Sequence, residues 1–205
     1  MDVIRIDLNK KLKRTFYTRD GITVAKDLLG KILIRIIEDE FIACKIVETE
    51  AYIGPEDKGC HAYGNRKTKR TKTMFLKGGH SYVYLIYGMY NCLNVVASSE
   101  GKPEAVLVRA VEPIHGIEHI QQFRKIKSNK IENYTNGPGK LCMALNIDKS
   151  HDGLDFVESD EIFILYNEEH FHIVESKRIN IDYAEEYKDK LWRFYIKGNA
   201  FVSKR

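Results

Sequence analysis

The sequence predicts an α+β protein built on a curved, mixed but largely antiparallel sheet that is flanked by helices and carries a projecting β-hairpin. Short apolar and β-branched strands follow one another with only turns between them, and the helical segments are few and short. Strands and helices also do not alternate as a doubly wound fold requires. No internal repeat, low-complexity tract or linker divides residues 1–205, so we expect one domain.

The composition describes a globular protein of ordinary size. The chain has 205 residues, of which 43% are hydrophobic and 30% charged, and no apolar run approaches the roughly 18 residues of a membrane span. Its start, MDVIRIDLNKKLKR, lacks the apolar core of a signal peptide. We therefore expect an intracellular protein, cytoplasmic or nucleoid-associated in a bacterium and nuclear in a eukaryote. The four cysteines are widely spaced, which favours reduced thiols over disulfides or a zinc site.

The first elements of the chain predict a platform of one helix and two strands. Asp20 can cap a short helix over residues 21–29, which ends at Gly30. Residues 31–37 and 41–47 are typical of strands, and the acidic turn 38–40 joins them. The second strand continues until Gly54-Pro55 breaks it.

The stretch VETEAYIGPEDKGCH, residues 47–61, combines carboxylates with flat rings. Glu48, Glu50 and Tyr52 stand at a spacing of two, so on a strand they share one face. His61 follows beyond a loop that is long enough to fold back over Tyr52. A carboxylate framed by two rings could do acid or base work on a planar ligand. A solvated strand end with ordinary loop residues would show the same pattern.

Positive charge gathers directly after this stretch. The net charge of +4 and the sequence pI of about 8.7 permit a polyanionic partner without requiring one. Residues 58–72 contain no acidic residue and six cations: Lys58, Arg66, Lys67, Lys69, Arg70 and Lys72. This basic loop (residues 58–72) could contact nucleic acid or could simply be solvated.

Residues 81–97, SYVYLIYGMYNCLNVVA, predict two strands around a turn near Gly88. Tyrosines and other large side chains crowd this hairpin. A projecting aromatic hairpin beside a basic loop could enter a duplex groove and unstack bases. It could equally be a core hairpin with tyrosines at its wet ends.

Arg109 lies in the otherwise apolar strand AVLVRAV, residues 105–111. A guanidinium in such a strand is costly unless it is paired, and the candidate partners are Glu48, Glu50 and Glu112. A structural ion pair and a catalytic role are both compatible with this pattern.

The rest of the chain predicts short helices and strands. Pro113 is expected to open a helix that runs to about Lys127, and GPGK, residues 137–140, leads into a helix through Leu145. A glycine-rich turn with a lysine at a helix start is a weak phosphate-binding pattern. Further strands are expected at 161–166, 177–181 and 191–197, with an acidic, exposed connection at 182–190.

Taken in order, ETEAY, His61, YVYLIYGMYNCLN, LVRAVEP, GPGKLCMAL and RFYIKG resemble the motifs of the alkyladenine, or 3-methyladenine, DNA glycosylases. The resemblance extends from the first helix to Phe201. It implies a monofunctional base-excision repair enzyme that acts on double-stranded DNA. Such an enzyme flips a damaged purine out of the duplex and hydrolyses its N-glycosidic bond, leaving an abasic site.

The resemblance also implies which groups carry the chemistry. Glu50 would activate the attacking water, Arg109 would help to hold that water, and the main-chain carbonyl of Ile179 would complete its cradle. This chemistry requires no metal and no cofactor.

For the flipped base, the resemblance implies a slot between two rings. Tyr52 and His61 would sandwich the base, and Tyr84 would close one edge. Asn94 would meet the exocyclic amino group of normal guanine and so discourage its binding.

For the duplex, the resemblance implies a wedge and a set of backbone contacts. Tyr87 would fill the gap left by the flipped nucleotide, and Met74 would support the neighbouring stack. The DNA backbone would be met by cations from the basic loop and the later helix: Arg66, Lys67, Lys69, Arg70 and Lys140.

The range of lesions and some alternative functions remain open at this stage. The resemblance makes excision of 7-methylguanine, hypoxanthine and ethenoadenine besides 3-methyladenine an expectation. Gly59 and Cys60 stand where alanines are usual, and this difference bears on the pocket volume available to hypoxanthine and ethenoadenine. A non-enzymatic nucleic-acid-binding module would need no Glu50, and a hydrolase of free nucleosides would need no Tyr87. A Lys58 nucleophile would form a Schiff base instead. We expect a monomer that does not bind membranes.

Overall fold

The centre of the computed structural model, which describes residues 6–204, is the long strand β2 (Glu40–Ile53). One side of β2 pairs with β5 (Glu104–His115) over most of its length. The other side pairs first with β1 (Ile32–Ile37), over residues 40–45, and then with β8 (Arg193–Ile196), over residues 48–50. Irregular register around Glu48 marks the change of partner. The first part of the N-terminal segment on which the targeting expectation rests lies outside the described residues.

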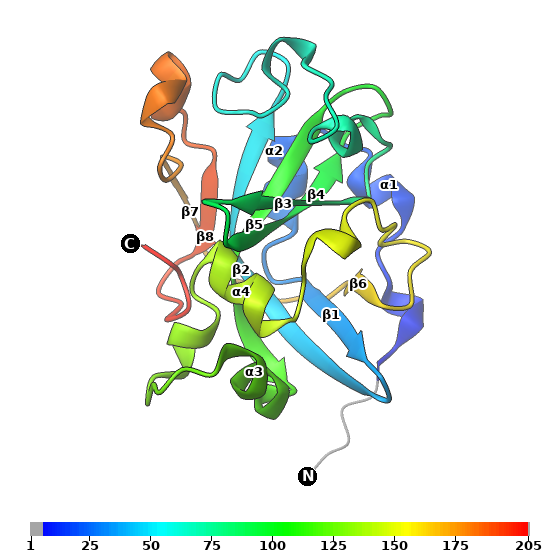
Figure 1. Ribbon diagram of the computed structural model, residues 1–205, viewed down its shortest axis with the longest axis vertical. Helices are drawn as coiled ribbons and strands as arrows, with labels where there is room; N and C mark the ends of the chain where they lie inside the picture. Colours follow the sequence, from blue (N-terminus) through cyan, green and yellow to red (C-terminus); the bar gives the residue numbers. More distant parts are fainter. Residues whose placement is uncertain (1–5, 205) are drawn as a thin grey trace.

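Four further strands complete the sheet: β3 (Ser81–Ile86), β4 (Tyr90–Ala97), β6 (Ile162–Leu165) and β7 (Ile173–Ser176). The strand order is β3-β4-β5-β2-β1-β6, and β7 joins through β8. Every pair of named strands described in the structure is antiparallel. The strands turn progressively across the sheet in Figure 1, and the hairpin β3–β4 projects from it. The predicted α+β class with a curved sheet and a projecting hairpin is confirmed.

Helices are short and lie against this sheet. They are α1 (Arg14–Tyr17), α2 (Gly21–Asp27), α3 (Ile117–Arg124) and α4 (Pro138–Ala144). Asp20 caps α2 by accepting a hydrogen bond from the Thr23 amide, as predicted. Helix α2 packs on β2 and β5, and α4 packs on β4 and β5. Short 3₁₀ turns lie at Leu8–Lys10, Tyr63–Asn65, Lys72–Phe75, Ile131–Tyr134, Lys149–His151 and Asp182–Asp189.

The helix that was expected to begin at Pro113 is wrong. Strand β5 continues through Pro113, which pairs with Cys44 beside a shift in register. Strand β4 covers only residues 104–107 of β5, so Pro113 lies where the other edge of β5 is free and its missing N–H leaves no ladder bond unmade. Gly116, with a φ of 77°, then turns the chain into α3.

The expected strand at 177–181 is also wrong, because β7 ends at Ser176. The alternation of Ile179 and Ile181 suggested a strand, but Asn180 has a φ of 60° and turns the chain there. The segment is a loop that passes beside the end of β2. The strands expected at 161–166 and 191–197 are present as β6 and β8.

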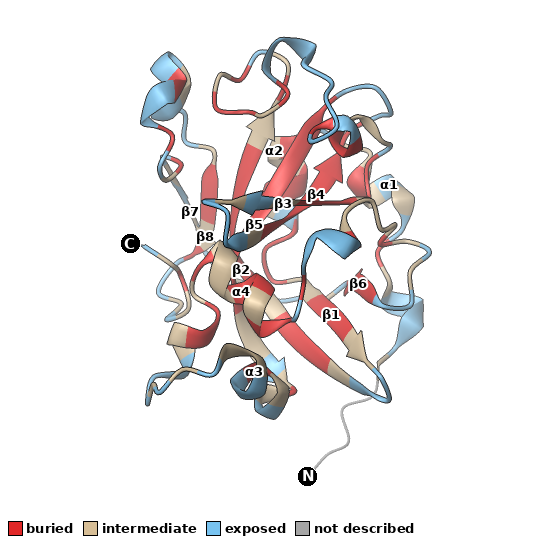
Figure 2. Ribbon diagram, viewed as in Figure 1, coloured by how far each residue is buried: buried red, intermediate tan, exposed pale blue. Residues whose placement is uncertain are grey.

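Burial is highest along the strands, whereas the tip of the β3–β4 hairpin and parts of the loops and of α3 are exposed (Figure 2). The main core combines residues from β2, β4 and β5 with residues from α2 and α4. The Thr49 hydroxyl bonds the Ala25 carbonyl of α2 at 2.8 Å, so the neighbouring residues Glu48 and Glu50 face the other side of the sheet. Within residues 6–204, no helix has the length and apolarity needed to span a membrane.

Candidate active site

Glu50 is fully buried near the end of β2, and three groups hold its carboxylate. The main-chain N–H of Ile179 donates to Oε1 at 2.8 Å, and the Tyr52 hydroxyl donates to Oε2 at 2.9 Å. A guanidinium nitrogen of Arg109 lies 3.2 Å from Oε2. This arrangement fixes the carboxylate in one orientation and keeps a cation beside it. The amide of Ile179, rather than its carbonyl, makes the observed contact.

Glu48 forms the centre of a second buried network beneath the first. Its Oε1 accepts from Nε of Arg109 at 3.1 Å and from Arg193 at 2.8 Å. Ser203 adds its amide at 2.6 Å to Oε2 and its hydroxyl at 3.0 Å to Oε1. The expected pairing of Arg109 with a carboxylate is confirmed, and Arg109 bridges Glu48 and Glu50. Glu112, the third candidate, pairs with Lys45 instead.

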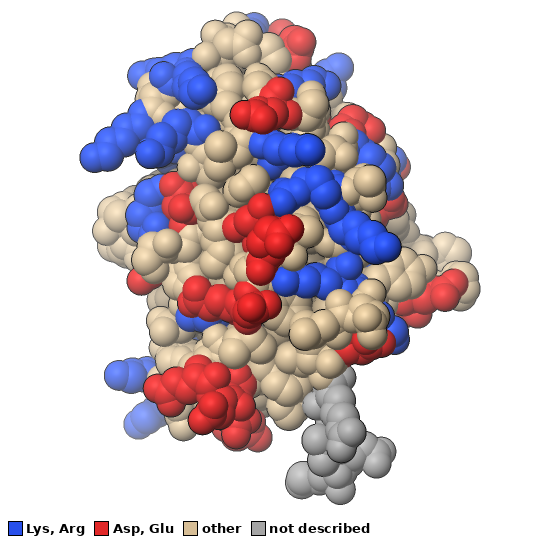
Figure 3. Space-filling model, turned by 90° about the vertical axis from the view of Figure 1, so that its right-hand side faces the viewer, with Lys and Arg blue, Asp and Glu red and all other residues tan. Residues whose placement is uncertain are grey.

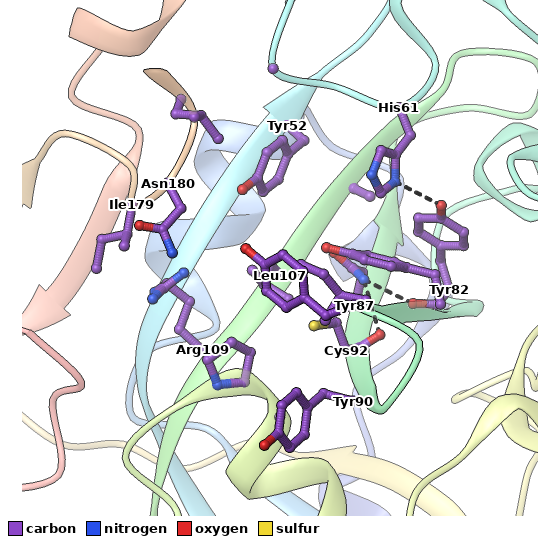
Figure 4. A pocket seen from close by; sticks show the side chains of 18 of the residues that line it. Tyr52, His61, Tyr82, Tyr87, Tyr90, Cys92, Leu107, Arg109, Ile179 and Asn180 are labelled. Carbon is purple, nitrogen blue, oxygen red and sulfur yellow. Dashed lines mark hydrogen bonds between the residues drawn. The ribbon is translucent and has the colours of Figure 1, made fainter. Parts of the chain in front are cut away.

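A cavity of about 460 Å³ opens in front of Glu50. The three residues that bind Glu50, namely Tyr52, Arg109 and Ile179, all line it, while Glu50 itself is buried behind them. Figure 4 shows Tyr52 and His61 on opposite sides of its upper part, with the Arg109 side chain below Tyr52. A mostly apolar cavity with a few convergent polar groups is typical of a small-ligand site.

His61 is held by its neighbours as a neutral ring. Its Nδ1 lies 2.9 Å from the Tyr82 hydroxyl, and its Nε2 lies 3.3 Å from a guanidinium nitrogen of Arg70. Because Arg70 can only donate, Nε2 is the acceptor and Nδ1 carries the proton. The Tyr84 ring meets His61 edge-on, with 4.6 Å between ring centroids and an interplanar angle of 82°. Tyr84 therefore stands at the edge of the His61 wall.

We expect the neutrality of His61 to make the protein less stable in acid. Burial, and next the charge of Arg70, lower the pKa of His61 from 6.5 to about 4. As the pH falls from 6.5 to 4, the unfolded chain takes up a proton that the folded protein refuses, so stability is lost across this window. The loss is at most about 1.4 kcal/mol per pH unit, the value for one proton.

Urea unfolding of wild type and of His61→Gln at pH 7, 6, 5 and 4.5 measures this effect. The variant should show a shallower fall in its free energy of unfolding. An NMR titration of the His61 ring with a midpoint near 6.5 would contradict the expectation.

Asn94 also lines the cavity and is 3% exposed. Its amide nitrogen donates to the carbonyls of Tyr82 at 2.9 Å and Cys92 at 3.3 Å. The strand pair β3–β4 thus orients this side chain and leaves its Oδ1 as the atom that a ligand would meet.

The tip of the β3–β4 hairpin presents exposed apolar side chains. Tyr87 is 74% exposed and Met89 is 65% exposed. Tyr87 and Gly88 have φ values of 53° and 71°, and the Met89 amide bonds the Ile86 carbonyl at 3.2 Å, which describes a type I′ turn. An aromatic residue rarely adopts this left-handed conformation, so the fold holds Tyr87 outward at a local cost.

Met74 does not occupy the position that the sequence suggested for it. It is 1% exposed and packs with Cys60, Tyr82 and Ala105 under the cavity. A buried side chain cannot support a stack of bases on the surface. The exposed methionine beside Tyr87 is Met89, which the sequence reasoning assigned only to the crowded hairpin.

The predicted DNA-backbone residues of the basic loop, Arg66, Lys67, Lys69 and Arg70, are all exposed. Lysine and arginine side chains gather at the upper left of the molecule in Figure 3, at the end where Figure 1 places this loop. Arg70 lies over the Tyr84 ring, with 5.1 Å to its centroid, so the loop adjoins the cavity.

Lys58, at the start of the basic loop, and Lys140, on α4, both have protein partners. Lys58 pairs with Glu185 at 2.6 Å and Glu186 at 3.2 Å, which ties it to the segment Asp182–Asp189. Lys140 donates to Asn136 at 2.6 Å, and burial lowers its pKa. Neither lysine approaches Glu50 through a contact that the structure describes.

Several residues of the site were not predicted from the sequence. Arg178, Asn180 and Tyr183 belong to the misassigned strand and its neighbouring loop, yet the last two line the cavity. Asp57, in the loop before His61, forms a fully buried pair with Arg178. Its two members are 121 residues apart, so no local sequence pattern links them.

The sequence matches known proteins over almost the whole chain. A sequence model of the methylpurine-DNA glycosylase family matches residues 15–200. A protein of Natranaerobius thermophilus is 55% identical over 195 residues, which are 94% of this chain and 98% of its own. A protein of Clostridium novyi is 57% identical over 202 residues, which are 96% of this chain and 100% of its own. Both carry the name "Putative 3-methyladenine DNA glycosylase".

The family resemblance drawn from the sequence motifs is thereby confirmed. Enzymes of this kind are hydrolases of N-glycosyl bonds. The match covers β2 with its buried glutamate, the hairpin and the strand β8. This chain belongs to the methylpurine-DNA glycosylase family.

Proposed function

We propose that this protein flips damaged purines out of duplex DNA and hydrolyses their N-glycosidic bond with a water activated by Glu50. The substrates would be 3-methyladenine, 7-methylguanine, hypoxanthine and ethenoadenine, and the product an abasic site. The observation that carries the proposal is the oriented, fully buried Glu50 carboxylate directly behind a ring-walled cavity.

Base flipping is favoured by features at both ends of the cavity. Extruding a nucleotide costs a few kcal/mol, and less for a damaged pair. Stacking between Tyr52 and His61 returns about 1 to 3 kcal/mol for the base. The exposed ring of Tyr87 can take the vacated place in the stack, which makes the return of the nucleotide less favourable.

Bond cleavage needs a base for the water and a counter-charge for the sugar. The sugar becomes oxocarbenium-like, so the Glu50 carboxylate can take the water proton and also stabilise the developing positive charge. A guanidinium nitrogen of Arg109 lies 3.2 Å from Oε2 of Glu50, so Arg109 can also reach the same water. The Ile179 carbonyl would supply the third contact to the water.

The electrostatics of the walls suit a cationic base. A purine methylated at N3 or N7 already carries positive charge and leaves readily. The His61 ring and the tyrosines offer π faces, and the His61 ring itself adds no positive charge, since burial lowers the pKa of His61 to about 4. Neutral hypoxanthine needs protonation to leave, so the protein must supply more of the rate acceleration for this base.

The test uses defined duplexes that each contain one lesion, with an unmodified duplex and the matching free nucleosides as controls. We expect release of the free base from lesion duplexes, with an alkali-labile site left behind, and no release from free nucleosides. Absence of release from every lesion duplex would refute the proposal. Borohydride trapping of a protein–DNA adduct would indicate an amine nucleophile in place of the water.

A substitution at Tyr87 tests the wedge. Tyr87→Asn removes the ring but keeps a residue that tolerates positive φ, so the turn survives. We expect single-turnover excision from duplex DNA to fall about 10- to 100-fold, corresponding to one lost stacking interaction. Excision from a single strand should change little.

The matched control is Tyr166→Asn, which removes another exposed tyrosine, 48% exposed, outside the cavity lining. It should leave both rates unchanged. An equal loss on single-stranded and duplex substrates for Tyr87→Asn would argue against a wedge.

A further inference from the structure

We infer that the buried pair of Asp57 and Arg178 is a positioning device. It fixes the two base-stacking walls, Tyr52 and His61, in position relative to Glu50. The inference rests on the proposed function, because it assigns these residues to the excision step. Neither residue touches the cavity as a lining group, so neither is a catalytic residue.

Asp57 fixes the loop that leads from β2 to His61. Its two oxygens receive Arg178 in a bidentate pair, at 2.5 Å and 2.7 Å, and both side chains are fully buried. The same oxygens accept the amides of Ile53 at 3.1 Å and Gly59 at 2.9 Å. One carboxylate therefore ties the end of β2 to the residues immediately before His61.

Arg178 reaches the other two working groups. It donates to the Ala51 carbonyl at 3.0 Å, and its guanidinium lies 4.7 Å from the centroid of the Tyr52 ring. The next residue along the chain, Ile179, gives its amide to Glu50. A displacement of Arg178 would move the support of Tyr52 and a hydrogen bond of Glu50 together.

The pair carries a cost that points to a role beyond stability. The Nε of Arg178 is buried and has no hydrogen-bond partner among the described residues. An unmade bond on a buried cation is unfavourable, and such violations are expected where a site constrains geometry. The guanidinium is oriented by Asp57, by the carbonyls of Ala51 and Tyr187, and by the rings of Tyr52 and Trp192, while its Nε donor is left without a bond.

The two loops that this pair joins also meet at the rim of the cavity. The Tyr183 hydroxyl lies 3.4 Å from the Gly59 carbonyl, and Lys58 pairs with Glu185 and Glu186. The ion pairs of Lys58 are exposed and the Tyr183 contact is only partly buried, so we assign the holding of the walls to the fully buried pair.

The experiment measures chemistry and binding separately in Arg178→Lys and Asp57→Asn. Lysine keeps the charge of Arg178 but cannot form the bidentate pair or the flat contact with Tyr52. At a temperature where circular dichroism shows full folding, single-turnover excision from a hypoxanthine duplex should fall at least tenfold. The dissociation constant for a duplex with an abasic-site analogue should stay within about twofold.

The matched control is Asp155→Asn, which breaks the ion pair of Asp155 with Arg14, away from the cavity. It should leave the excision rate unchanged. If folded Arg178→Lys and Asp57→Asn excise at the wild-type rate while wild type is active, the positioning role is refuted and the proposed function stands.

A thiol measurement decides the matter without enzyme activity. Cys60 is 5% exposed, and its amide bonds the Asp57 carbonyl at 2.8 Å. Its reaction with a thiol reagent should be several-fold faster in Arg178→Lys than in wild type and Asp155→Asn, and Cys60→Ala identifies the signal. Unchanged Cys60 reactivity would refute the positioning role of the Asp57–Arg178 pair. This readout holds even if wild type releases no base and the proposed function itself fails.

Discussion

Glu50→Gln is expected to lower the single-turnover excision rate about 10²- to 10⁴-fold, the usual contribution of a placed general base. Glutamine has the shape of glutamate, so one oxygen can still accept from the Ile179 amide or the Tyr52 hydroxyl. It cannot accept from both and from Arg109, and it has no charge to offer the sugar. The pocket is retained while the base and the counter-charge are lost.

Excision of 7-methylguanine and hypoxanthine from defined duplexes measures this prediction. Binding to a duplex with an abasic-site analogue should be preserved. The matched control is Glu175→Gln on β7, which removes a partly exposed carboxylate paired with Lys26 and should leave the rate unchanged. A Glu50→Gln enzyme as active as wild type would rule out the proposed mechanism, and a binding module without activity would be indifferent to the substitution.

Glu48→Ala is expected to lower the free energy of unfolding by about 3 to 5 kcal/mol, because removing one partner of a buried charge network strands the others. Glu48 is fully buried, and the side chains of Arg109 and Arg193 are 9% and 6% exposed. The substitution would leave two guanidinium groups facing an empty space and the Ser203 amide without its acceptor.

Urea unfolding at pH 7 measures this loss. The control is Asp189→Asn, which breaks the exposed pair with Lys177, whose side chains are 62% and 55% exposed. That change should cost less than about 1 kcal/mol. A loss below about 1 kcal/mol for Glu48→Ala would mean that the network contributes little to stability. Because Arg109 also contacts Glu50, any folded Glu48→Ala protein should excise slowly.

Sequence patterns predicted the parts of the fold that local forces determine. Asp20 begins α2 because a cap acts within one turn of helix, whereas α2 ends at Asp27, before the Gly30 that was expected to end it. The hairpin was predicted because period-two alternation and a glycine turn are both local. The pairing of Arg109 followed from the cost of an unpaired buried charge, which requires only that some carboxylate be near.

The parts that were wrong or missing depend on contacts distant in sequence. Pro113 stays in a strand because it pairs with Cys44 of β2 beside a shift in register. The sequence around Pro113 does not show this pairing. Arg193 and Ser203 reach Glu48 across 145 and 155 residues. Met74 and Met89 differ in burial, not in sequence character, so only the fold shows which one faces outward.

The change of partners along β2 separates the rigid part of this protein from its adaptable part. Glu50 pairs with Leu107 on one side and with Arg193 on the other, so its backbone lies inside two ladders. A fluctuation that frees it must break both, which brings the opening free energy close to that of global unfolding. Tyr87, the basic loop and the rim loops lie outside these ladders. Substitutions there can change how the surface meets a partner while Glu50 keeps its position in the sheet.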